Sequence, residues 1–271
     1  MYIKYFLLKM KTYKEKTILI TGASSGIGEA FAKHLDKLGA KLILTARSED
    51  KLNSLASSMN NALVIPGDLS DRTFPRNLYK QIIDKGIDID ILINNAGFGF
   101  SGLFLTSNME NYEEMLNVNI YSLMDLSHLF LKDMVKKEQG GIINISSLAS
   151  YQPMPYFAVY AATKAFVTSF TLALHEEYRC KGIKILGVCP GYTKTSFNKR
   201  AQISSKTIPG YIMTSEEVVE QSLKAFSKGK HIIINGRINR FVKFLTSMLP
   251  TRLAMRMVKG VIKRGMEDSK W

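Results

Sequence analysis

The sequence predicts an α/β fold: a Rossmann-type, doubly wound parallel sheet of seven strands with helices on both faces, followed by C-terminal amphipathic helices. Short apolar, β-branched runs alternate with segments of helical spacing, which is typical of parallel sheets covered on both faces. Glycines or polar residues follow most of these runs, at the strand ends where ligands bind in such sheets. We expect one α/β domain at residues 17–235, between an N-terminal extension (1–16) and a C-terminal extension (236–271).

The apolar runs and the helical spacings give the expected elements. The strands are expected at residues 17–21, 41–46, 62–66, 89–93, 141–146, 183–188 and 232–234. Helical spacing follows the first strand and covers 109–137, 156–179 and 214–226, the last opened by a capping-box pattern. The irregular stretch 196–213 is long for a compact domain, and we expect it to be a lid over a binding site.

Charge and cysteine content limit the possible classes of protein. The 271 residues carry a net charge of +14, and much of it lies at the ends, because residues 236–264 contain eight Lys or Arg and no acid. The two cysteines form no C-x-x-C pair, so we expect a reducing compartment and a cytoplasmic protein. No apolar run approaches the roughly 20 residues that span a bilayer, and the first 16 residues lack a signal-peptide cleavage site.

A glycine motif follows the first expected strand. In Thr21-Gly22-x-x-x-Gly26-x-Gly28, the first glycine suits a tight turn, and the others let the backbone approach a phosphate and the next helix pack closely. The helix N-terminus then offers free N–H groups and a partial positive charge. Nucleotide binding is therefore favoured over a turn that only closes a βα unit.

The second expected strand ends at Arg47, and residues 45–47 include no acid. An acid at this place accepts from the ribose 2′-hydroxyl, whereas an arginine suits a 2′-phosphate. The sequence therefore predicts NADP(H) over NAD(H). The alternative is a solvated arginine at a strand end.

Tyr160 and Lys164 are four residues apart in an expected helix, so both side chains share one face. A tyrosine has a pKa near ~10, and a nearby lysine cation favours the phenolate. Such a pair can donate a proton to a carbonyl oxygen or accept one from an alcohol. The spacing is common by chance, so its weight depends on the other motifs.

Together these motifs resemble the short-chain dehydrogenase/reductase superfamily over residues 17–235, which would be its catalytic domain. The resemblance rests on six motifs in order: Thr21-Gly22-x-x-x-Gly26-x-Gly28, Asn94-Asn95-Ala96-Gly97, Asn117-Val118-Asn119, Ser147, Tyr160-x-x-x-Lys164 and Pro190-Gly191-x-x-x-Thr195. It implies an NADP-dependent oxidoreductase acting on the CH–OH group, with Tyr160 as general acid and Ser147 bonded to the substrate oxygen. Lys164 would lower the pKa of the tyrosine and bind the nicotinamide ribose, and Asn119 would hold a water that relays protons.

The resemblance also implies the cofactor contacts. They are Gly22, Ser24, Ser25, Gly26, Ile27, Gly28, Arg47, Asp68, Leu69, Asn95, Ala96, Gly97, Tyr160, Lys164, Pro190, Gly191, Thr193 and Thr195. Asp68 and Leu69 are assigned to the adenine, and Thr193 and Thr195 to the nicotinamide end. The family's usual separation from the tyrosine selects Ser147 over Ser146. No metal site is expected, because the helical histidines lack a second ligand at metal spacing.

The C-terminal extension shows two amphipathic segments divided by Pro250. The apolar faces comprise Phe241, Phe244, Leu245, Met248 and Leu249, then Ala254, Met257, Val258 and Val261, and the basic flank comprises Arg252, Arg256, Lys259 and Lys263. This pattern is typical of helices in a membrane interface, and equally of helices packed on their own domain or on a dimer partner. Both alternatives stay open.

The function expected from these observations is reduction of a ketone or aldehyde to an alcohol, or the reverse, on a hydrophobic, lipid- or steroid-like substrate. A non-catalytic NADP(H)-binding regulator or a membrane- or partner-associated scaffold is the alternative, and the complete set of Asn119, Ser147, Tyr160 and Lys164 argues against it. Nucleic acid is not expected as a partner, because the aromatics of the tail share its apolar face. A homo-oligomer is expected by resemblance, through residues 109–137 and 156–179.

Overall fold

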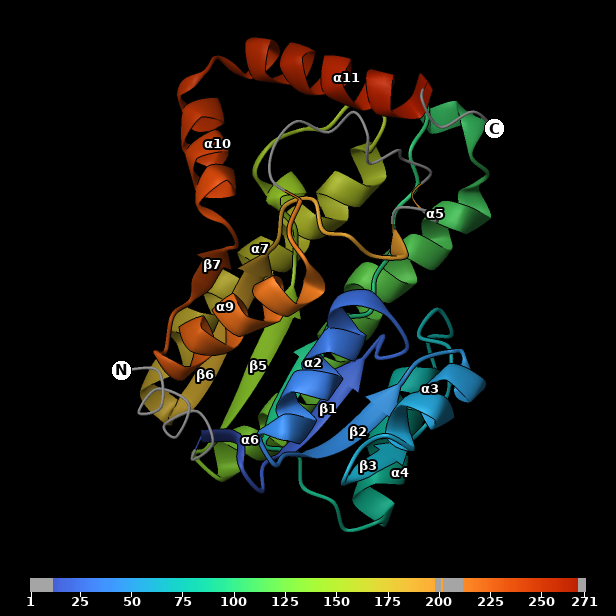
Figure 1. Ribbon diagram of the computed structural model, residues 1–271, viewed down its shortest axis with the longest axis vertical. Coiled ribbons are helices and arrows are strands. Elements are labelled where there is room, and N and C mark those ends of the chain that lie inside the picture. Colours follow the sequence, from blue (N-terminus) through green and yellow to red (C-terminus); the bar gives the residue numbers. More distant parts are fainter. Residues whose placement is uncertain (1–11, 198–200, 202–211, 268–271) are drawn as a thin grey trace.

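A seven-stranded parallel sheet lies at the centre of the structure, with helices on both faces (Figure 1), as predicted. The structure is a computed structural model that describes residues 12–197, 201 and 212–267. The strands are β1 (Thr17–Thr21), β2 (Lys41–Thr45), β3 (Ala62–Val64), β4 (Ile91–Asn94), β5 (Gly140–Ile145), β6 (Ile183–Cys189) and β7 (Ile232–Ile234). Their order in the sheet is β3-β2-β1-β4-β5-β6-β7, and every neighbouring pair is parallel.

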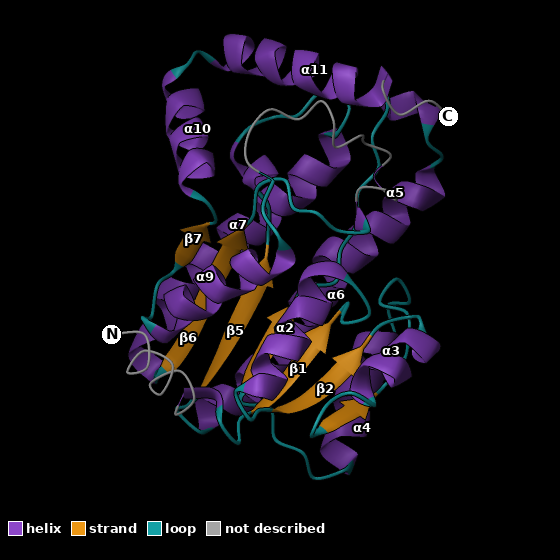
Figure 2. Ribbon diagram, in the orientation of Figure 1, coloured by secondary structure: helices purple, strands orange, loops and turns teal. Residues whose placement is uncertain are grey.

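Helices connect the strands and cover the sheet (Figure 2). They are α2 (Gly26–Lys37), α3 (Glu49–Ala56), α4 (Phe74–Asp84), α5 (Met109–Leu116), α6 (Ser122–Lys136), α7 (Ala158–Tyr178), α9 (Ser215–Ser227), α10 (Arg237–Met248) and α11 (Thr251–Glu267). Short 3-10 turns lie at η1 (Phe104–Thr106), η3 (Leu148–Tyr151) and η4 (Arg179–Lys181). The predicted capping box is present at α9, where Thr214 and Glu217 bond each other's backbone N–H groups.

Alternation along the strands divides the buried apolar residues between two cores. Ile18 and Ile20 of β1 lie in the core beneath α2, α3 and α9, and Leu19 lies in the core beneath α4, α5 and α6. Successive side chains of a strand point to opposite faces, so a strand buried on both sides must be apolar throughout. The parallel order then brings all strand carboxyl ends to one edge, which is where the functional site forms.

The helix predicted at 109–137 is interrupted. A π-helical turn, η2 (Asn117–Tyr121), separates α5 from α6, and the N–H of Ser122 donates to the carbonyl of Asn117 five residues before it. A wide turn of this kind leaves backbone groups without their usual partners and is frequent at functional sites. The periodicity of apolar residues continues through the turn, so the sequence pattern did not reveal it.

Described residues of both predicted extensions pack on the domain. Tyr13 is fully buried, and its hydroxyl donates to the carbonyl of Leu223 in α9 at 3.0 Å, so the core begins before residue 17. After β7, α10 rises along one side of the molecule and α11 crosses above the carboxyl edge of the sheet (Figure 1). The predicted lid at 196–213 falls mainly on residues that lie outside the described ones.

Candidate active site

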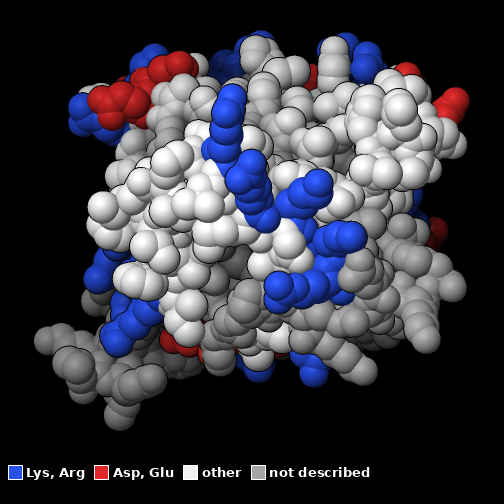
Figure 3. All heavy atoms as spheres, turned by 90° about the horizontal axis from the view of Figure 1, so that it is seen from above, with Lys and Arg blue, Asp and Glu red and all other residues white. Residues whose placement is uncertain are grey.

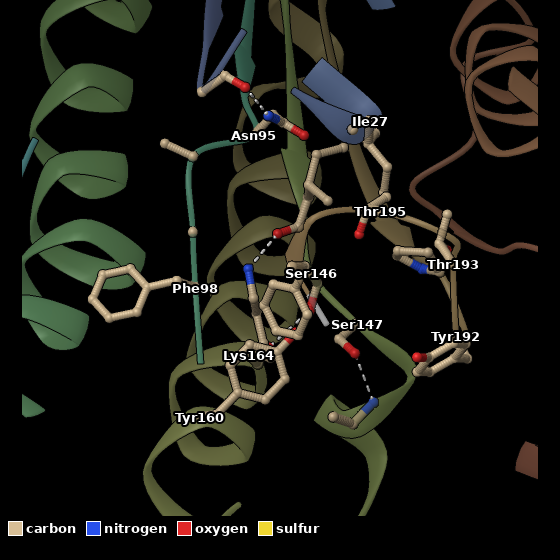
Figure 4. A pocket seen from close by; sticks show the side chains of 18 of the residues that line it. Ile27, Asn95, Phe98, Ser146, Ser147, Tyr160, Lys164, Tyr192, Thr193 and Thr195 are labelled. Atoms are coloured by element: carbon tan, nitrogen blue, oxygen red, sulfur yellow. Dashed lines mark hydrogen bonds between the residues drawn. The ribbon is translucent and has the colours of Figure 1, made fainter. Parts of the chain in front are cut away.

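A cavity of about 660 Å³ opens at the carboxyl edge of the sheet and gathers nearly all the predicted site residues (Figure 4). Those that line it are Gly22, Ser24, Ser25, Gly26, Ile27, Arg47, Asp68, Leu69, Asn95, Ala96, Gly97, Ser147, Tyr160, Lys164, Pro190, Gly191, Thr193 and Thr195. They come from elements far apart in the sequence, which the parallel sheet brings to one edge. Gly28 and Asn119 are the two predicted site residues that lie behind the lining.

Gly28 supports the cavity wall from within. A Cβ at this position would lie 2.3 Å from the carbonyl oxygen of Gly22 and 2.5 Å from Nδ2 of Asn95. The helix α2 can therefore approach the turn only with glycine here. Gly22 itself has a φ of +63°, a left-handed conformation that favours glycine.

The N-terminus of α2 faces the cavity. Ser25 is its N-cap residue, and its side chain makes no capping hydrogen bond to the first turn; its hydroxyl accepts one from Ser196 at 3.1 Å instead. The N–H groups of the first turn carry the positive end of the helix dipole. An anionic group of a ligand is stabilised at this place.

Asn95 ties the loop after β4 to the glycine turn. Its side-chain amide donates to the carbonyls of Thr21 and Gly22 at 2.9 and 3.1 Å, and its backbone N–H donates to the hydroxyl of Thr21 at 3.0 Å. These bonds fix two cavity walls relative to each other. The predicted contact of Asn95 with the cofactor therefore depends on the atoms that remain, chiefly its Oδ1.

Arg47 lies at the cavity wall between two acids. Its Nη1 is 3.1 Å from Oε1 of Glu114 in α5 and 3.8 Å from Oδ2 of Asp68. Both acids also line the cavity, and the arginine side chain is half-exposed. A pair in this position is solvated and weak, so the guanidinium can exchange a carboxylate partner for another anion.

The phenol of Tyr160 and the hydroxyl of Ser147 share the inner part of the cavity (Figure 4). Burial raises the pKa of Tyr160 to about 12, and a hydrogen bond with Ser147 partly offsets this effect. Ser147 is held at the N-cap of η3, where its hydroxyl oxygen accepts from the N–H of Ala149 at 3.1 Å. The phenol is therefore protonated at neutral pH.

Lys164 lies one turn after Tyr160 in α7, as predicted, but the pKa of the tyrosine is raised on balance, because burial dominates. Its ammonium donates to the carbonyl of Ile145 at 2.8 Å and is 5.9 Å from the centre of the Tyr160 ring. Burial lowers the pKa of Lys164 itself to about 8. The cost of burying both groups exceeds the stabilisation of the phenolate by the cation at this distance.

Asn119 lies in the π-helical turn, fully buried beside Lys164 and Phe98. Its Oδ1 accepts from the N–H of Phe98 at 3.1 Å, and its Nδ2 donates to the carbonyl of Phe98 and the hydroxyl of Thr163 at 2.9 and 3.0 Å. The side chain is thus committed to protein partners.

Three other polar residues of the motifs have structural roles. Ser146 is buried, and its hydroxyl donates to the carbonyl of Lys164 at 2.9 Å, on the side of α7. Asn94 bridges β4 to Ser127 and Asn144, and Asn117 donates to the carbonyl of Ser70. The bonds of Ser146 and Asn94 hold the elements that carry Ser147 and Lys164. The bond of Asn117 holds the π-helical turn to the loop after β3.

The C-terminal helices contribute cavity residues that the sequence did not identify. They are Val242 and Thr246 of α10 and Met257, Val258, Val261 and Ile262 of α11. Ile262 is buried in a cluster with Phe157, and Tyr160 and Val258 pack against the same cluster. Met257, Val258 and Val261 belong to a predicted apolar face, but periodicity alone cannot say which surface that face covers.

Within the described part of the chain, no group of three or more His, Cys, Asp and Glu side chains is arranged to hold a metal ion. None of the described helices has the length and apolar character needed to cross a bilayer. A second cavity of about 320 Å³ is lined by aromatic and aliphatic residues and by Lys259 of α11.

Comparison with known proteins gives relatives in both sequence and structure. A family model described as short chain dehydrogenase matches residues 16–205. A very-long-chain 3-oxoacyl-CoA reductase of Homo sapiens is 31% identical over 266 residues, covering 93% of this chain and 82% of that protein.

Two solved structures share the fold. A short-chain dehydrogenase from Sphingobium yanoikuyae in complex with NADPH has a TM-score of 0.77 and 29% identity, covering 87% of this chain and 96% of that chain. A 3-ketoacyl-(acyl-carrier-protein) reductase from Brucella melitensis complexed with NADH has a TM-score of 0.75 and 26% identity, covering 83% and 99%. With the parallel sheet and the cavity at its carboxyl edge, these matches show that the chain is an oxidoreductase of the short-chain dehydrogenase/reductase superfamily.

Proposed function

We propose that the protein reduces a hydrophobic ketone or aldehyde to an alcohol, or catalyses the reverse, with NADP(H) as cofactor. The proposal rests on one observation. Tyr160, Ser147 and Lys164 line the same cavity as the N-terminus of α2, which has no side-chain cap. A reactive carbonyl needs a proton donor and a second hydrogen-bond donor where charge develops, and this group supplies both.

The residues of the cavity fit a nicotinamide dinucleotide. The glycine turn and α2 offer N–H groups to a pyrophosphate, and Gly97 keeps the space beside Lys164 open. A Cβ at Gly97 would lie 3.1 Å from Oδ1 of Asn119 and 3.2 Å from Nζ of Lys164. The bound nicotinamide supplies the hydride, and the protein supplies orientation and proton transfer.

Each predicted catalytic residue has a role in this proposal. Ser147 donates a hydrogen bond to the substrate oxygen and positions it against Tyr160, whose phenol gives up its proton as the oxygen gains negative charge. Lys164 stabilises the resulting phenolate and binds the ribose of the cofactor. Asn119 fixes the strand-end loop at Phe98. In this proposal Asn119 also holds the water that relays protons to Lys164.

The proposed preference for NADP(H) rests on Arg47. A 2′-phosphate carries more charge than either carboxylate partner of Arg47, and the half-exposed guanidinium can turn to it from Asp68 and Glu114. The Sphingobium structure holds NADPH and the Brucella structure NADH, so the relatives support a nicotinamide cofactor in general.

The proposed hydrophobic substrate is supported by the walls near Tyr160. Apolar side chains come from the strand-end loops and from the C-terminal helices: Phe98, Leu148, Met154, Phe157, Phe197, Val258, Val261 and Ile262. A pocket of this lining binds apolar ligands with a few polar groups to orient them. The human and Brucella relatives are named as reductases of oxoacyl thioesters, which agrees with a lipid-like substrate.

We also propose a cytoplasmic protein that forms a homo-oligomer and touches a membrane peripherally through α10 and α11. Both cysteines are free, with Cys189 buried and Cys180 exposed, which fits a reducing compartment. No nucleic acid is proposed as a partner.

The test is turnover of a panel of carbonyls, measured by the loss of the reduced cofactor's absorbance with NADPH and with NADH. We expect turnover that favours NADPH and long-chain ketones. Tyr160→Phe removes the proton donor and should lower kcat by about 10²–10⁴-fold. Tyr178→Phe, the same substitution later in α7, is the matched control and should leave kcat unchanged. Tight NADPH binding without turnover in the wild type would favour the regulator instead.

A further inference from the structure

The helix α10 has an apolar stripe that its own domain leaves uncovered. Phe241, Phe244 and Met248 are 63%, 59% and 69% exposed, and Ile238 and Leu245 extend the same stripe. Their spacing of three and four residues is the spacing by which helices normally bury one face in a core. Contiguous exposed apolar surface of this kind marks an interaction site.

The next helix, α11, separates apolar and basic side chains between two faces. Ala254, Val258 and Ile262 face the domain, and Ala254 and Ile262 are buried. The opposite face carries the exposed Arg252, Arg256, Lys259 and Lys263. Figure 3, seen from above, shows Lys and Arg gathered across the middle of this end of the molecule, with Asp and Glu at its margins.

A second apolar segment lies beside α11. Lys259 lines the smaller cavity together with Leu103 and Phe104, and Leu103, Phe104 and Leu105 are all exposed. The basic face of α11 thus has exposed apolar side chains next to it in η1 and exposed apolar side chains in the preceding helix α10. Basic and apolar groups combined in this way are typical of surfaces that lie in a membrane interface.

The corner between α10 and α11 brings exposed side chains to the active-site cavity. Val242 and Met257 both line the cavity, and they are 40% and 51% exposed. Side chains that line a cavity and also contact solvent lie where the cavity can open. From this corner, the lining of Val258, Val261 and Ile262 leads to Tyr160.

The positive charge of this surface distinguishes between two possible partners, a second copy of the chain and an anionic lipid surface. A second copy of the chain would bring another set of eight Lys or Arg and no acid in residues 236–264, so two such surfaces would repel. An anionic lipid surface attracts the same residues and buries the apolar stripe.

We propose that the corner between α10 and α11 is the substrate entrance and that it opens onto an anionic lipid surface, from which a hydrophobic ketone passes directly to Tyr160. The inference rests on the proposed function for its last step. Its first step, lipid binding by α10 and α11, is independent of turnover. The two steps therefore have separate tests.

The first test is co-sedimentation of the full-length protein with vesicles of phosphatidylglycerol or of phosphatidylcholine. We expect binding to the anionic vesicles that weakens as salt rises. Replacing Arg256 and Lys263 by Gln should weaken it about fivefold for each charge removed. The triple variant Phe241→Ser, Phe244→Ser, Met248→Ser should weaken it by at least about tenfold.

The matched control for the triple variant is Ile83→Ser, which replaces an exposed apolar residue of α4, at the opposite end of the molecule (Figure 1). It should bind vesicles like the wild type. Each variant is first shown to be folded by its thermal melt and its NADPH affinity. Equal binding by the triple variant and the wild type, or no preference for anionic vesicles, would overturn the lipid contact.

The second test compares kcat/KM for a long-chain methyl ketone dissolved in phosphatidylglycerol vesicles with kcat/KM for a short, water-soluble ketone. Val242→Trp narrows the entrance and should lower the first value about tenfold more than the second. A fall that is equal for both ketones would show damage to the site and overturn the entrance. Absence of turnover with both ketones in the wild type would overturn the proposed function and leave the vesicle-binding result intact.

Discussion

At the scale of single residues, burial governs the chemistry of the site. Burial of Tyr160 and Lys164 favours the neutral form of each side chain. It raises the pKa of Tyr160 to about 12 and lowers the pKa of Lys164 to about 8. The phenol of Tyr160 therefore keeps its proton throughout the neutral pH range. The lysine is the group whose charge changes near physiological pH.

This difference predicts the pH dependence of carbonyl reduction. Lys164 loses its charge as the pH rises through about 8, and the uncharged amine no longer stabilises the phenolate. We expect kcat/KM for reduction to be flat below this pH and to fall about tenfold per pH unit above it. A fall that began only above the ordinary lysine pKa of 10.5 would contradict the assignment.

A thermal melt over the same pH range is the control. The folded pKa of Lys164 lies below its ordinary value of 10.5, so the unfolded chain binds this proton more strongly. The contribution of Lys164 to the free energy of unfolding therefore increases as the pH rises from about 8 toward 10.5. Loss of activity near pH 8 would thus not be caused by unfolding through this group.

At the scale of elements, the sequence predicts local features better than contacts between distant residues. The strand β1 was predicted at its observed bounds because alternation and the glycine turn are properties of neighbouring residues. The ion pair of Arg47 with Glu114 joins residues that are 67 positions apart, and no local pattern reports it. The return of α11 over Tyr160 is missed for the same reason. The π-helical turn at Asn119 is missed because the apolar periodicity continues through it.

The close approach of α2 to the glycine turn gives a prediction about stability. Gly28→Ala places a methyl group against backbone atoms of Gly22 that cannot move aside, and it should lower the free energy of unfolding by about 1–3 kcal/mol. Gly260→Ala is the matched control, because a Cβ at Gly260 in α11 meets nothing within 4 Å. The higher helix propensity of alanine should raise stability by up to about 1 kcal/mol. Denaturant unfolding of both variants measures the difference, and equal effects would contradict the packing argument.

At the scale of the whole molecule, the C-terminal extension joins the catalytic site to the surface. The same helix, α11, closes the cavity with one face and carries basic residues on the other. The sequence left open whether the tail packs on its domain or meets a membrane. In the structure the inner face of α11 packs on the domain, and the stripe of α10 stays exposed.

Exposed apolar side chains on α6 and α7 indicate that the protein forms a homo-oligomer through these helices. Met124 and Leu172 are exposed apolar residues on these two helices, on the opposite face of the sheet from α2 and α9. We expect the wild type to elute from a sizing column as a dimer or larger, and Met124→Glu with Leu172→Glu to elute as a monomer, because paired charges are costly to bury. Ile83→Glu in α4 should not change the elution. A monomeric wild type would contradict the prediction.

The two outermost strands of the sheet, β3 and β7, have only three residues each. A short border strand offers few unpaired backbone groups to a strand from another molecule, so the sheet is protected against growth by edge addition. Self-association is thereby left to helix surfaces, whose side chains select their partner. The short edge strands also protect the protein against ordered aggregation, although α10 and α11 carry many exposed apolar side chains.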